Sequence, residues 1–221
     1  MLRGQTASYQ DHEVALLPFD IINISQVSTP SSYSHCCGNA LDFVGYYAGE
    51  KRPYYAPFSC HRTGTTTSGY IYTSNNPVWT PSHGLTYVTV LFSHDNVTPQ
   101  QTSFNQGDLI GYMGDRGFVT GVHCHTEGSN MANAGYINSG VTCAGGNVCW
   151  MLSNNKPYAS LFYITGDETI RDTKGISFTK WDGGVTPPTP PTPPAKKFIK
   201  LLLMLKRKRK GGLKRYGAVR V

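Results

Sequence analysis

The sequence predicts a mainly β domain with an antiparallel sheet and long loops. Two observations support this fold class. The chain up to about residue 183 is rich in Gly, Thr, Ser, Asn, Tyr and Val and poor in Leu, Glu and Lys, a composition that suits short strands and disfavours long helices. Short apolar runs also alternate with turn-forming clusters such as Asn75-Asn76-Pro77 and Ala144-Gly145-Gly146-Asn147. That alternation is typical of antiparallel strands joined by turns and longer loops.

The 221 residues divide into four segments by composition. Residues 1–29 are predicted to be an N-terminal lead-in, and residues 30–183 a single domain, which is long enough to bury a sizeable core. Residues 184–195 are a Pro/Thr-rich linker, which should be extended and stiff because proline fixes φ. Residues 196–221 form a basic tail that we expect to work apart from the domain.

The strands are predicted from their apolar, β-branched and aromatic residues. The clearest runs are 16–24 in the lead-in and 70–72, 86–92 and 108–113 in the domain, and a weaker run covers 161–164.

Charge is distributed very unevenly along the chain. The tail holds 11 of the 20 Lys and Arg residues and none of the 13 Asp and Glu residues, which leaves residues 1–195 with 9 basic residues, 13 acidic residues and a net charge of −4. The tail also contains the apolar stretch Phe198–Leu205, interrupted by Lys200 and too short to span a bilayer. Two interpretations stay open: a solvated tail, or a segment that binds an anionic membrane or wall polymer. The Leu-rich run argues against nucleic acid as the partner.

The segment Gly121-Val122-His123-Cys124-His125 is the most informative motif. Residues i and i+2 of an extended segment point to the same side, so the two imidazoles would face one point. Imidazole is a good ligand for zinc. Cys124 should face the opposite side and pack in the core.

Other residues are available to complete such a site. His35 and Asp42 lie seven residues apart, and Asp42 is flanked by apolar residues that suggest a strand. His94 follows the apolar run 90–92 at the end of a predicted strand. A catalytic zinc site needs three protein ligands and one open position, so this set is sufficient.

Taken in order, these residues resemble the lysostaphin-type zinc endopeptidases that cut peptidoglycan peptides. That family has an early His and Asp, later a strand that ends in His, then a Gly-rich run leading to G-x-H-x-H. Here the corresponding segments are His35 with Asp42, the segment 89–94, the run 106–114 and the motif 121–125. The resemblance covers roughly residues 30–130.

The resemblance implies particular roles. His35, Asp42 and His125 would bind Zn²⁺, in a groove formed by the loops. His94 and His123 would stand beside the metal ion as catalytic residues. Two departures from the family's pattern are the long spacer between His35 and Asp42 and a cysteine where an aliphatic residue is usual.

The six cysteines are too sparse to predict a disulfide scaffold. Cys36 and Cys37 are adjacent and poorly placed to bond to each other, and ligation of zinc by their thiolates is an alternative to the ligand set above. A Cys143–Cys149 bridge across the Gly-rich loop is a further alternative.

The remaining candidates have ordinary interpretations beside functional ones. His12, His61 and His83 should be ordinary polar residues. His61 and His83 lie in loops and could alternatively line a groove. Glu127 would be either a surface carboxylate or a partner of a metal-binding His. Five aromatic side chains would either pack in the core or line the bottom of the groove and contact the substrate. They are Tyr54, Tyr55, Tyr70, Tyr72 and Trp79.

The resemblance implies a zinc-dependent endopeptidase that acts on bacterial peptidoglycan and causes cell lysis. The first residues lack the pattern of a secretory signal. We therefore expect a bacteriophage endolysin that reaches the wall from the host cytoplasm through a separate membrane lesion, or a virion-associated lysin. A catalytically degenerate wall-binding protein and a structural tail protein are the alternatives.

Overall fold

A computed structural model of the chain describes residues 1–117 and 119–183. The linker and the basic tail therefore lie outside the described residues. An eight-stranded sheet forms the centre of the fold, and all of its neighbouring strands are antiparallel except β3 and β16. In spatial order the strands are β11 (Ser103–Phe104), β6 (Cys60–Thr65), β7 (Gly69–Ser74), β10 (Thr89–Ser93), β13 (Cys124–Ser129), β4 (Leu41–Phe43), β3 (Ile21–Val27) and β16 (Thr169–Asp172).

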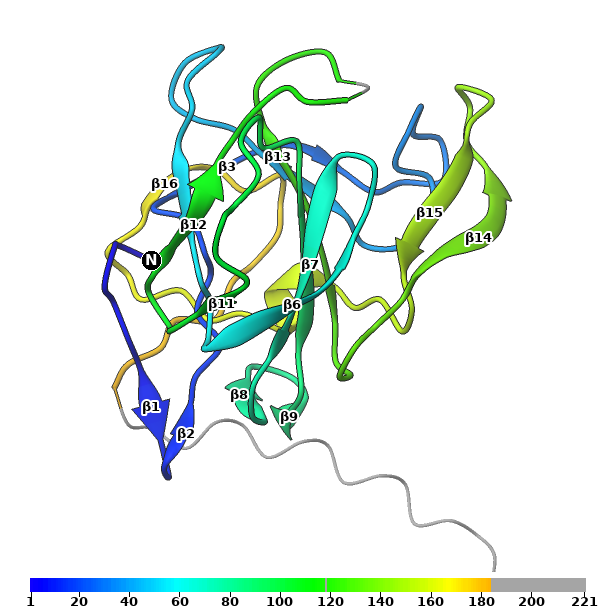
Figure 1. The fold of residues 1–221 in the computed structure, drawn as a ribbon. Helices are drawn as coiled ribbons and strands as arrows, with labels where there is room; N and C mark the ends of the chain where they lie inside the picture. The colour runs from blue at the N-terminus through cyan, green and yellow to red at the C-terminus, as the bar shows by residue number, and fades with distance from the viewer. Residues whose placement is uncertain (118, 184–221) are drawn as a thin grey trace, which may run out of the picture. The chain divides into compact units, whose positions relative to one another are not determined.

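Four small two-stranded sheets surround this central sheet (Figure 1). They pair β1 (Ser8–Tyr9) with β2 (His12–Glu13), β5 (Pro53–Tyr55) with β12 (Leu109–Tyr112), β8 (Val78–Thr80) with β9 (Gly84–Thr86), and β14 (Tyr136–Thr142) with β15 (Val148–Leu152). The only helix among the described residues is a single 3-10 turn, η1 (Tyr158–Ser160). No helix in the described ranges is long and apolar enough to cross a membrane.

The main core is rich in aromatic side chains. Phe19 and Phe43 stack with ring centroids 4.2 Å apart, and Tyr54 and Phe92 lie 4.7 Å apart in the same cluster. Cys124 belongs to this cluster and is fully buried, so the prediction that it faces the core is confirmed. Because aromatic rings bury a large area each, this cluster fixes the strands that carry the candidate site residues on their opposite face.

The structure confirms the predicted fold class and most of the predicted strands. The run 70–72 lies in β7, the run 86–92 covers the end of β9 and most of β10, and the run 108–113 contains β12. The run 16–24 becomes a strand only from Ile21 onward, and β3 is an inner strand of the central sheet.

The prediction of a strand over 161–164 is wrong. This segment follows η1 and makes only isolated bridges, from Tyr163 to Leu16 and from Ile164 to Lys180. All four of its side chains are buried. Its apolar character therefore reflects packing in the core and not membership of a sheet, and a short apolar run alone does not separate the two.

Candidate metal centre

Strand register brings two distant parts of the sequence together. In the pairing of β13 with β4, His125 lies opposite Asp42, and in the pairing of β13 with β10 it lies opposite Ser93. His94 follows directly after β10. Because cross-strand partners point to the same face, three neighbouring strands direct their polar side chains into one place.

Three side chains meet there with their ligand atoms close together, namely His35, Asp42 and His125. His125 Nδ1 lies 3.0 Å from His35 Nε2 and 3.1 Å from Asp42 Oδ1, and His35 Nε2 lies 3.6 Å from the same oxygen. Ligand atoms that surround a tetrahedral zinc ion at about 2.0–2.1 Å are about 3.3 Å apart. Two imidazoles and one carboxylate with these separations fit a zinc ion.

The electrostatics of the group also suit a cation. Burial raises the pKa of Asp42, but the hydrogen bond from His125 and the neighbouring imidazoles outweigh burial, so the pKa is lower than usual. Burial lowers the pKa of His125, but Asp42 and Glu127 outweigh burial and raise it to about 10. The two carboxylates therefore favour a positive charge at this point of the fold.

Glu127 is a buried partner of His125. Its Oε1 lies 3.3 Å from His125 Nε2, while its Oε2 accepts hydrogen bonds from the Leu152 backbone N–H at 2.7 Å and from Asn155 Nδ2 at 3.0 Å. Glu127 is only 1% exposed, so the interpretation of Glu127 as a surface carboxylate is wrong. If a metal ion replaced the proton on His125 Nδ1, the Nε2–H could still donate to Glu127, and the lone pair on Nδ1 would face His35 and Asp42.

The other two histidines are oriented in a similar way. His94 Nδ1 lies 2.8 Å from the Arg116 carbonyl oxygen, and His123 Nδ1 lies 2.8 Å from the Gly121 carbonyl oxygen. A carbonyl only accepts, so each Nδ1 carries a proton, and in the neutral form of such a ring the lone pair is on Nε2. His123 Nε2 lies 3.7 Å from Asp42 Oδ2, and the His94 and His123 rings are 4.5 Å apart.

The backbone at His94 is unusual. Its φ is 79°, in the left-handed region that non-glycine residues seldom adopt. The His94 carbonyl also faces Gly114 so closely that a Cβ there would lie 2.1 Å from the oxygen. The sharp turn after β10 is thus accommodated by a neighbour without a side chain. Burial lowers the pKa of His94 to about 4, so the ring is neutral at physiological pH.

His35 comes from a loop and not from a strand. The loop is closed by hydrogen bonds from His35 N to Ser32 Oγ, from Thr29 N to the His35 carbonyl, and from Ala40 N to Ser28 Oγ. This closure accommodates the long spacer before Asp42. Burial lowers the pKa of His35 to about 4, so this ring is also neutral and able to donate a lone pair.

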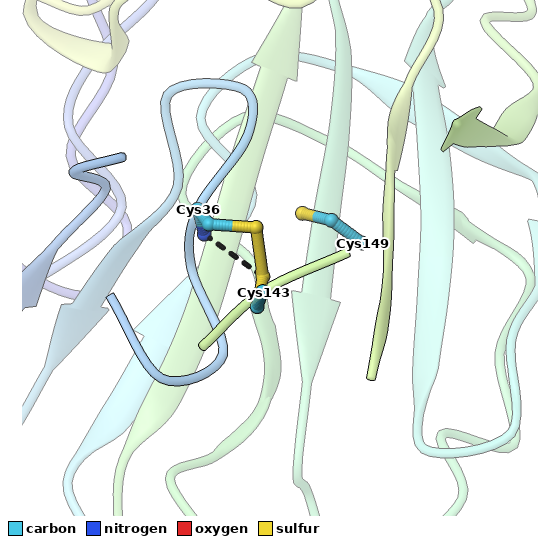
Figure 2. A group of neighbouring side chains, drawn as sticks. All are labelled: Cys36, Cys143 and Cys149. Atoms are coloured by element: carbon cyan, nitrogen blue, oxygen red, sulfur yellow. Dashed lines mark hydrogen bonds between the residues drawn. A yellow bond between two sulfur atoms is a disulfide. The ribbon is translucent and has the colours of Figure 1, made fainter. Parts of the chain in front are cut away.

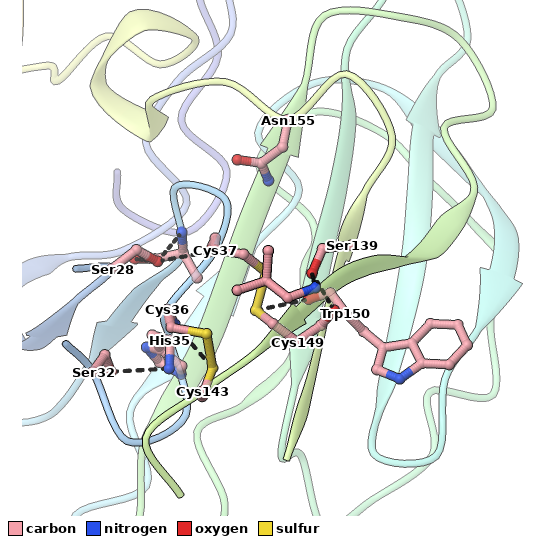
Figure 3. Close-up of a disulfide and its surroundings, with 12 residues drawn as sticks. Ser28, Ser32, His35, Cys36, Cys37, Ser139, Cys143, Cys149, Trp150 and Asn155 are labelled. Atoms are coloured by element: carbon pink, nitrogen blue, oxygen red, sulfur yellow. Dashed lines mark hydrogen bonds between the residues drawn. A yellow bond between two sulfur atoms is a disulfide. The ribbon is translucent and has the colours of Figure 1, made fainter. Parts of the chain in front are cut away.

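Two disulfides tie this loop to the β14–β15 hairpin, and they correct the sequence-based interpretation of the cysteines. Cys36 is bonded to Cys143 (Figure 2), and Cys37 is bonded to Cys149 (Figure 3). A Cys143–Cys149 bridge is therefore wrong, and the two adjacent cysteines are disulfide-bonded and not free thiolates. Figure 3 shows His35 beside these bonds. In the described ranges, Cys60 and Cys124 are free and buried.

A groove runs past the clustered side chains. One stretch of about 780 Å³ contains the clustered histidines and continues along the hairpin, where it is lined by Tyr33, Tyr136, Asn147, Val148 and Trp150. A second stretch of about 400 Å³ shares Asp42 and His123 with the first and continues toward Tyr46 and Tyr47. A chain-like substrate therefore has room on both sides of the site.

The other candidates lie away from the groove. His61 contacts Asn75 and His83 contacts Ser160, and neither histidine lines the groove. His12 pairs with Tyr9 in the β1–β2 hairpin. Four of the tyrosines that we considered as a substrate floor are buried, which confirms core packing for Tyr54, Tyr55, Tyr70 and Tyr72. Trp79 is partly buried and packs beside Tyr9. Sequence reasoning did not identify Tyr33 and Trp150, because their place beside the site depends on the disulfides.

Comparisons with known proteins give partial similarities. No family model matches the chain. A segment of 117 residues is 34% identical to Morphogenesis protein 1 of Bacillus phage B103 and covers 51% of this chain and 31% of that protein. The match therefore spans about a third of the relative's length. A solved zinc-containing peptidase from Vibrio cholerae is similar over 51% of this chain and 37% of its own, with 14% identity and a TM-score of 0.34. In part of its sequence, the chain is similar to a protein of a bacteriophage.

Proposed function

We propose that this chain is a zinc-dependent endopeptidase that hydrolyses peptide stems or cross-bridges of bacterial peptidoglycan. The observation that carries the proposal is the cluster of His35 Nε2, Asp42 Oδ1 and His125 Nδ1 at mutual separations of 3.0–3.6 Å. The order of these residues along the chain, which resembles the lysostaphin-type endopeptidases, supports the choice of substrate.

The chemistry follows from the residues around this cluster. A bound zinc ion would supply a Lewis acid that polarises a peptide carbonyl and acidifies a water molecule. The Nδ1 atoms of His94 and His123 each contact a backbone carbonyl oxygen, so a neutral ring at either position would have its lone pair on Nε2. One of them would take a proton from the attacking water, and the other, once protonated, would donate a hydrogen bond to the developing oxyanion.

The first test measures zinc and wall hydrolysis together. Purified protein should contain about one zinc ion per chain and clear a suspension of bacterial cell walls, and a strong chelator should stop the clearing until zinc is restored. His125→Ala should abolish both zinc binding and clearing. The matched control is His61→Ala, which removes an exposed imidazole outside the groove and should change neither. Clearing that continues unchanged after the metal is stripped would rule out the proposal.

A structural or wall-binding role in a phage particle is the second candidate, and one observation favours it. The phage B103 relative is named for morphogenesis. Immunoblots of purified particles would detect the chain if it is a virion component, whereas a free endolysin would occur only in the lysate. If His125→Ala particles infect normally and the purified chain clears no walls, the role is structural and the enzymatic proposal is wrong.

We propose that the basic tail holds the protein on an anionic membrane or wall polymer of the host. The charge of residues 196–221 supports this role, and the segment lies outside the described residues. Removal of residues 195–221 should reduce lysis of intact cells more than hydrolysis of soluble wall peptides. Equal losses in both assays would contradict an anchoring role.

A further inference from the structure

The wall of the groove formed by the β14–β15 hairpin has no role in the chemistry proposed above. Its side chains are Tyr33, Tyr136, Asn147, Val148 and Trp150, and we call them the hairpin wall. Tyr33 is 60% exposed and Trp150 48% exposed. Large aromatic side chains with this exposure beside a candidate active site indicate a contact surface for a ligand.

The two aromatic residues of the hairpin are arranged as a platform. Trp150 and Tyr136 stack with ring centroids 5.9 Å apart and an interplanar angle of 24°. Asn138 is the cross-strand partner of Trp150 and lies beside it on the hairpin. Figure 3 shows the Trp150 indole projecting away from the disulfides. Tyr136 therefore supports one face of the half-exposed Trp150 indole, with an amide group close by.

The hairpin wall is also held rigidly. The Tyr33 carbonyl accepts a hydrogen bond from the Gly145 N–H at 3.2 Å, and a Cβ at Gly145 would lie 2.7 Å from Tyr33 Cζ. With the two disulfides, this close packing fixes the loop of Tyr33 against the hairpin. A preformed surface loses little conformational entropy when it binds a ligand.

The charge of this region selects the class of ligand. From Gly128 to Asn155 the chain contains no Asp, Glu, Lys or Arg. Among residues 1–117 and 119–183, the groove stretch along the hairpin has Asp42 as its only carboxylate and is lined by no Lys or Arg. An uncharged ligand therefore suits the hairpin wall better than an anionic polymer or a charged peptide.

A neutral sugar chain has the required chemistry. Sugar rings present flat C–H faces, which stack on the electron-rich faces of Trp and Tyr. Their hydroxyl and N-acetyl groups pair with amide side chains of the kind that Asn138 and Asn147 provide. We propose that the hairpin wall is a subsite for the glycan strand of the wall polymer, built of N-acetylated hexosamines. The inference rests on the proposed function in one respect, which is the identity of the polymer that supplies these sugars.

A direct binding experiment tests the subsite without any catalysis. Zinc-loaded full-length protein is titrated calorimetrically with a soluble β-1,4-linked N-acetylglucosamine hexamer. Trp150→Ala should weaken binding about tenfold or more, because it removes the stacking face, and Trp150→Phe should recover part of the loss. Tyr87→Ala is the matched control, since Tyr87 is 40% exposed and lies outside the groove. Thermal unfolding of each variant confirms that it is folded.

A second readout separates sugar from peptide as the ligand. Trp150→Ala should raise KM for peptides attached to glycan fragments about tenfold and leave KM for free stem peptides unchanged. If the native chain does not bind the hexamer, or if both KM values rise equally, the glycan subsite is wrong. In the second case, the hairpin wall holds the peptide. If the native protein binds the hexamer but hydrolyses nothing, the subsite stands and the proposed enzyme activity fails.

Discussion

The two halves of the candidate metal centre are held in different ways. Asp42 and His125 stand on neighbouring strands in direct register, and their positions follow from the hydrogen-bond ladder of the central sheet. His35 stands on a loop that is fixed by side-chain hydrogen bonds and is attached to the β14–β15 hairpin by two disulfides. One half is positioned by regular secondary structure and the other by covalent cross-links.

The two halves should therefore lose their geometry under different conditions. A ladder of backbone hydrogen bonds in a packed sheet opens only with the sheet itself, whereas a loop has few buried contacts and opens locally at a lower cost. Cross-links that join segments 107 and 112 residues apart remove much of this freedom. Asp42 and His125, on the central sheet, should therefore keep their positions when the disulfides are reduced. His35, on the loop, should lose its position.

The largest effect is expected from removal of a ligand in either half. His35→Ala and His125→Ala should each eliminate detectable hydrolysis and weaken zinc binding by more than the 10–100-fold that is typical when only a supporting partner is lost. Zinc affinity is measured by competition with a chromogenic chelator. If His35→Ala keeps full zinc affinity, the sheet half binds the ion without the loop, and the three-ligand site is wrong.

The next effect should come from the two histidines that we propose to lie beside the metal ion without binding it. His123→Ala and His94→Ala are expected to lower kcat by about 10²–10⁴-fold, which is the usual contribution of a general acid or base. Zinc content should stay at the native level in both variants. Loss of zinc together with activity would show that these residues belong to the ligand set and not beside it.

A smaller effect is expected within the sheet half from Glu127→Gln. The amide side chain keeps the shape of Glu127 but removes the charge beside His125 Nε2. Zinc affinity should fall about 10–100-fold, as for other partners of metal-binding histidines, with the fold retained by circular dichroism. Asp115→Asn, which neutralises an exposed carboxylate hydrogen-bonded to Asn96, is the matched control and should leave zinc affinity unchanged.

The smallest effect on zinc affinity should come from removal of one of the two disulfides. Replacement of Cys37 and Cys149 by serine should lower the free energy of unfolding by about 2–5 kcal/mol. Zinc affinity should fall only at the low end of the 10–100-fold range, because Cys36–Cys143 still holds the loop. Amide hydrogen exchange should increase in residues 29–40 and in the hairpin, while β10 and β13 stay protected. Equal exposure of the sheet strands would contradict the separation into two halves.

Reduction of the native protein extends the same comparison. A mild thiol reductant should open both disulfides, whereas the thiols of Cys60 and Cys124 are buried, and burial raises the pKa of each. Thiol counting under native conditions should therefore find the four cysteines of the disulfides and not the two core thiols. Reduction that releases no zinc and leaves hydrolysis unchanged would show that the loop stays in place without its cross-links.

The mainly β fold, the common direction of His123 and His125 and the inward position of Cys124 could all be predicted from the sequence. These features depend on local composition and on the two-residue period of an extended chain, which can be followed along a single segment. The predicted ligand set could be proposed because His35, Asp42, His94 and the late histidines occur in a recognisable order. Their close approach depends on strand register, which no single segment contains.

The disulfide pairing, the burial of Glu127 and the hairpin wall became visible only in the folded protein. Cys36 and Cys37 meet partners more than a hundred residues away, and six cysteines allow many pairings. Glu127 lies on β13 and Trp150 on β15, yet one is 1% and the other 48% exposed. Burial of a side chain depends on the segments that pack against it in the folded chain. The local sequence pattern does not contain that information.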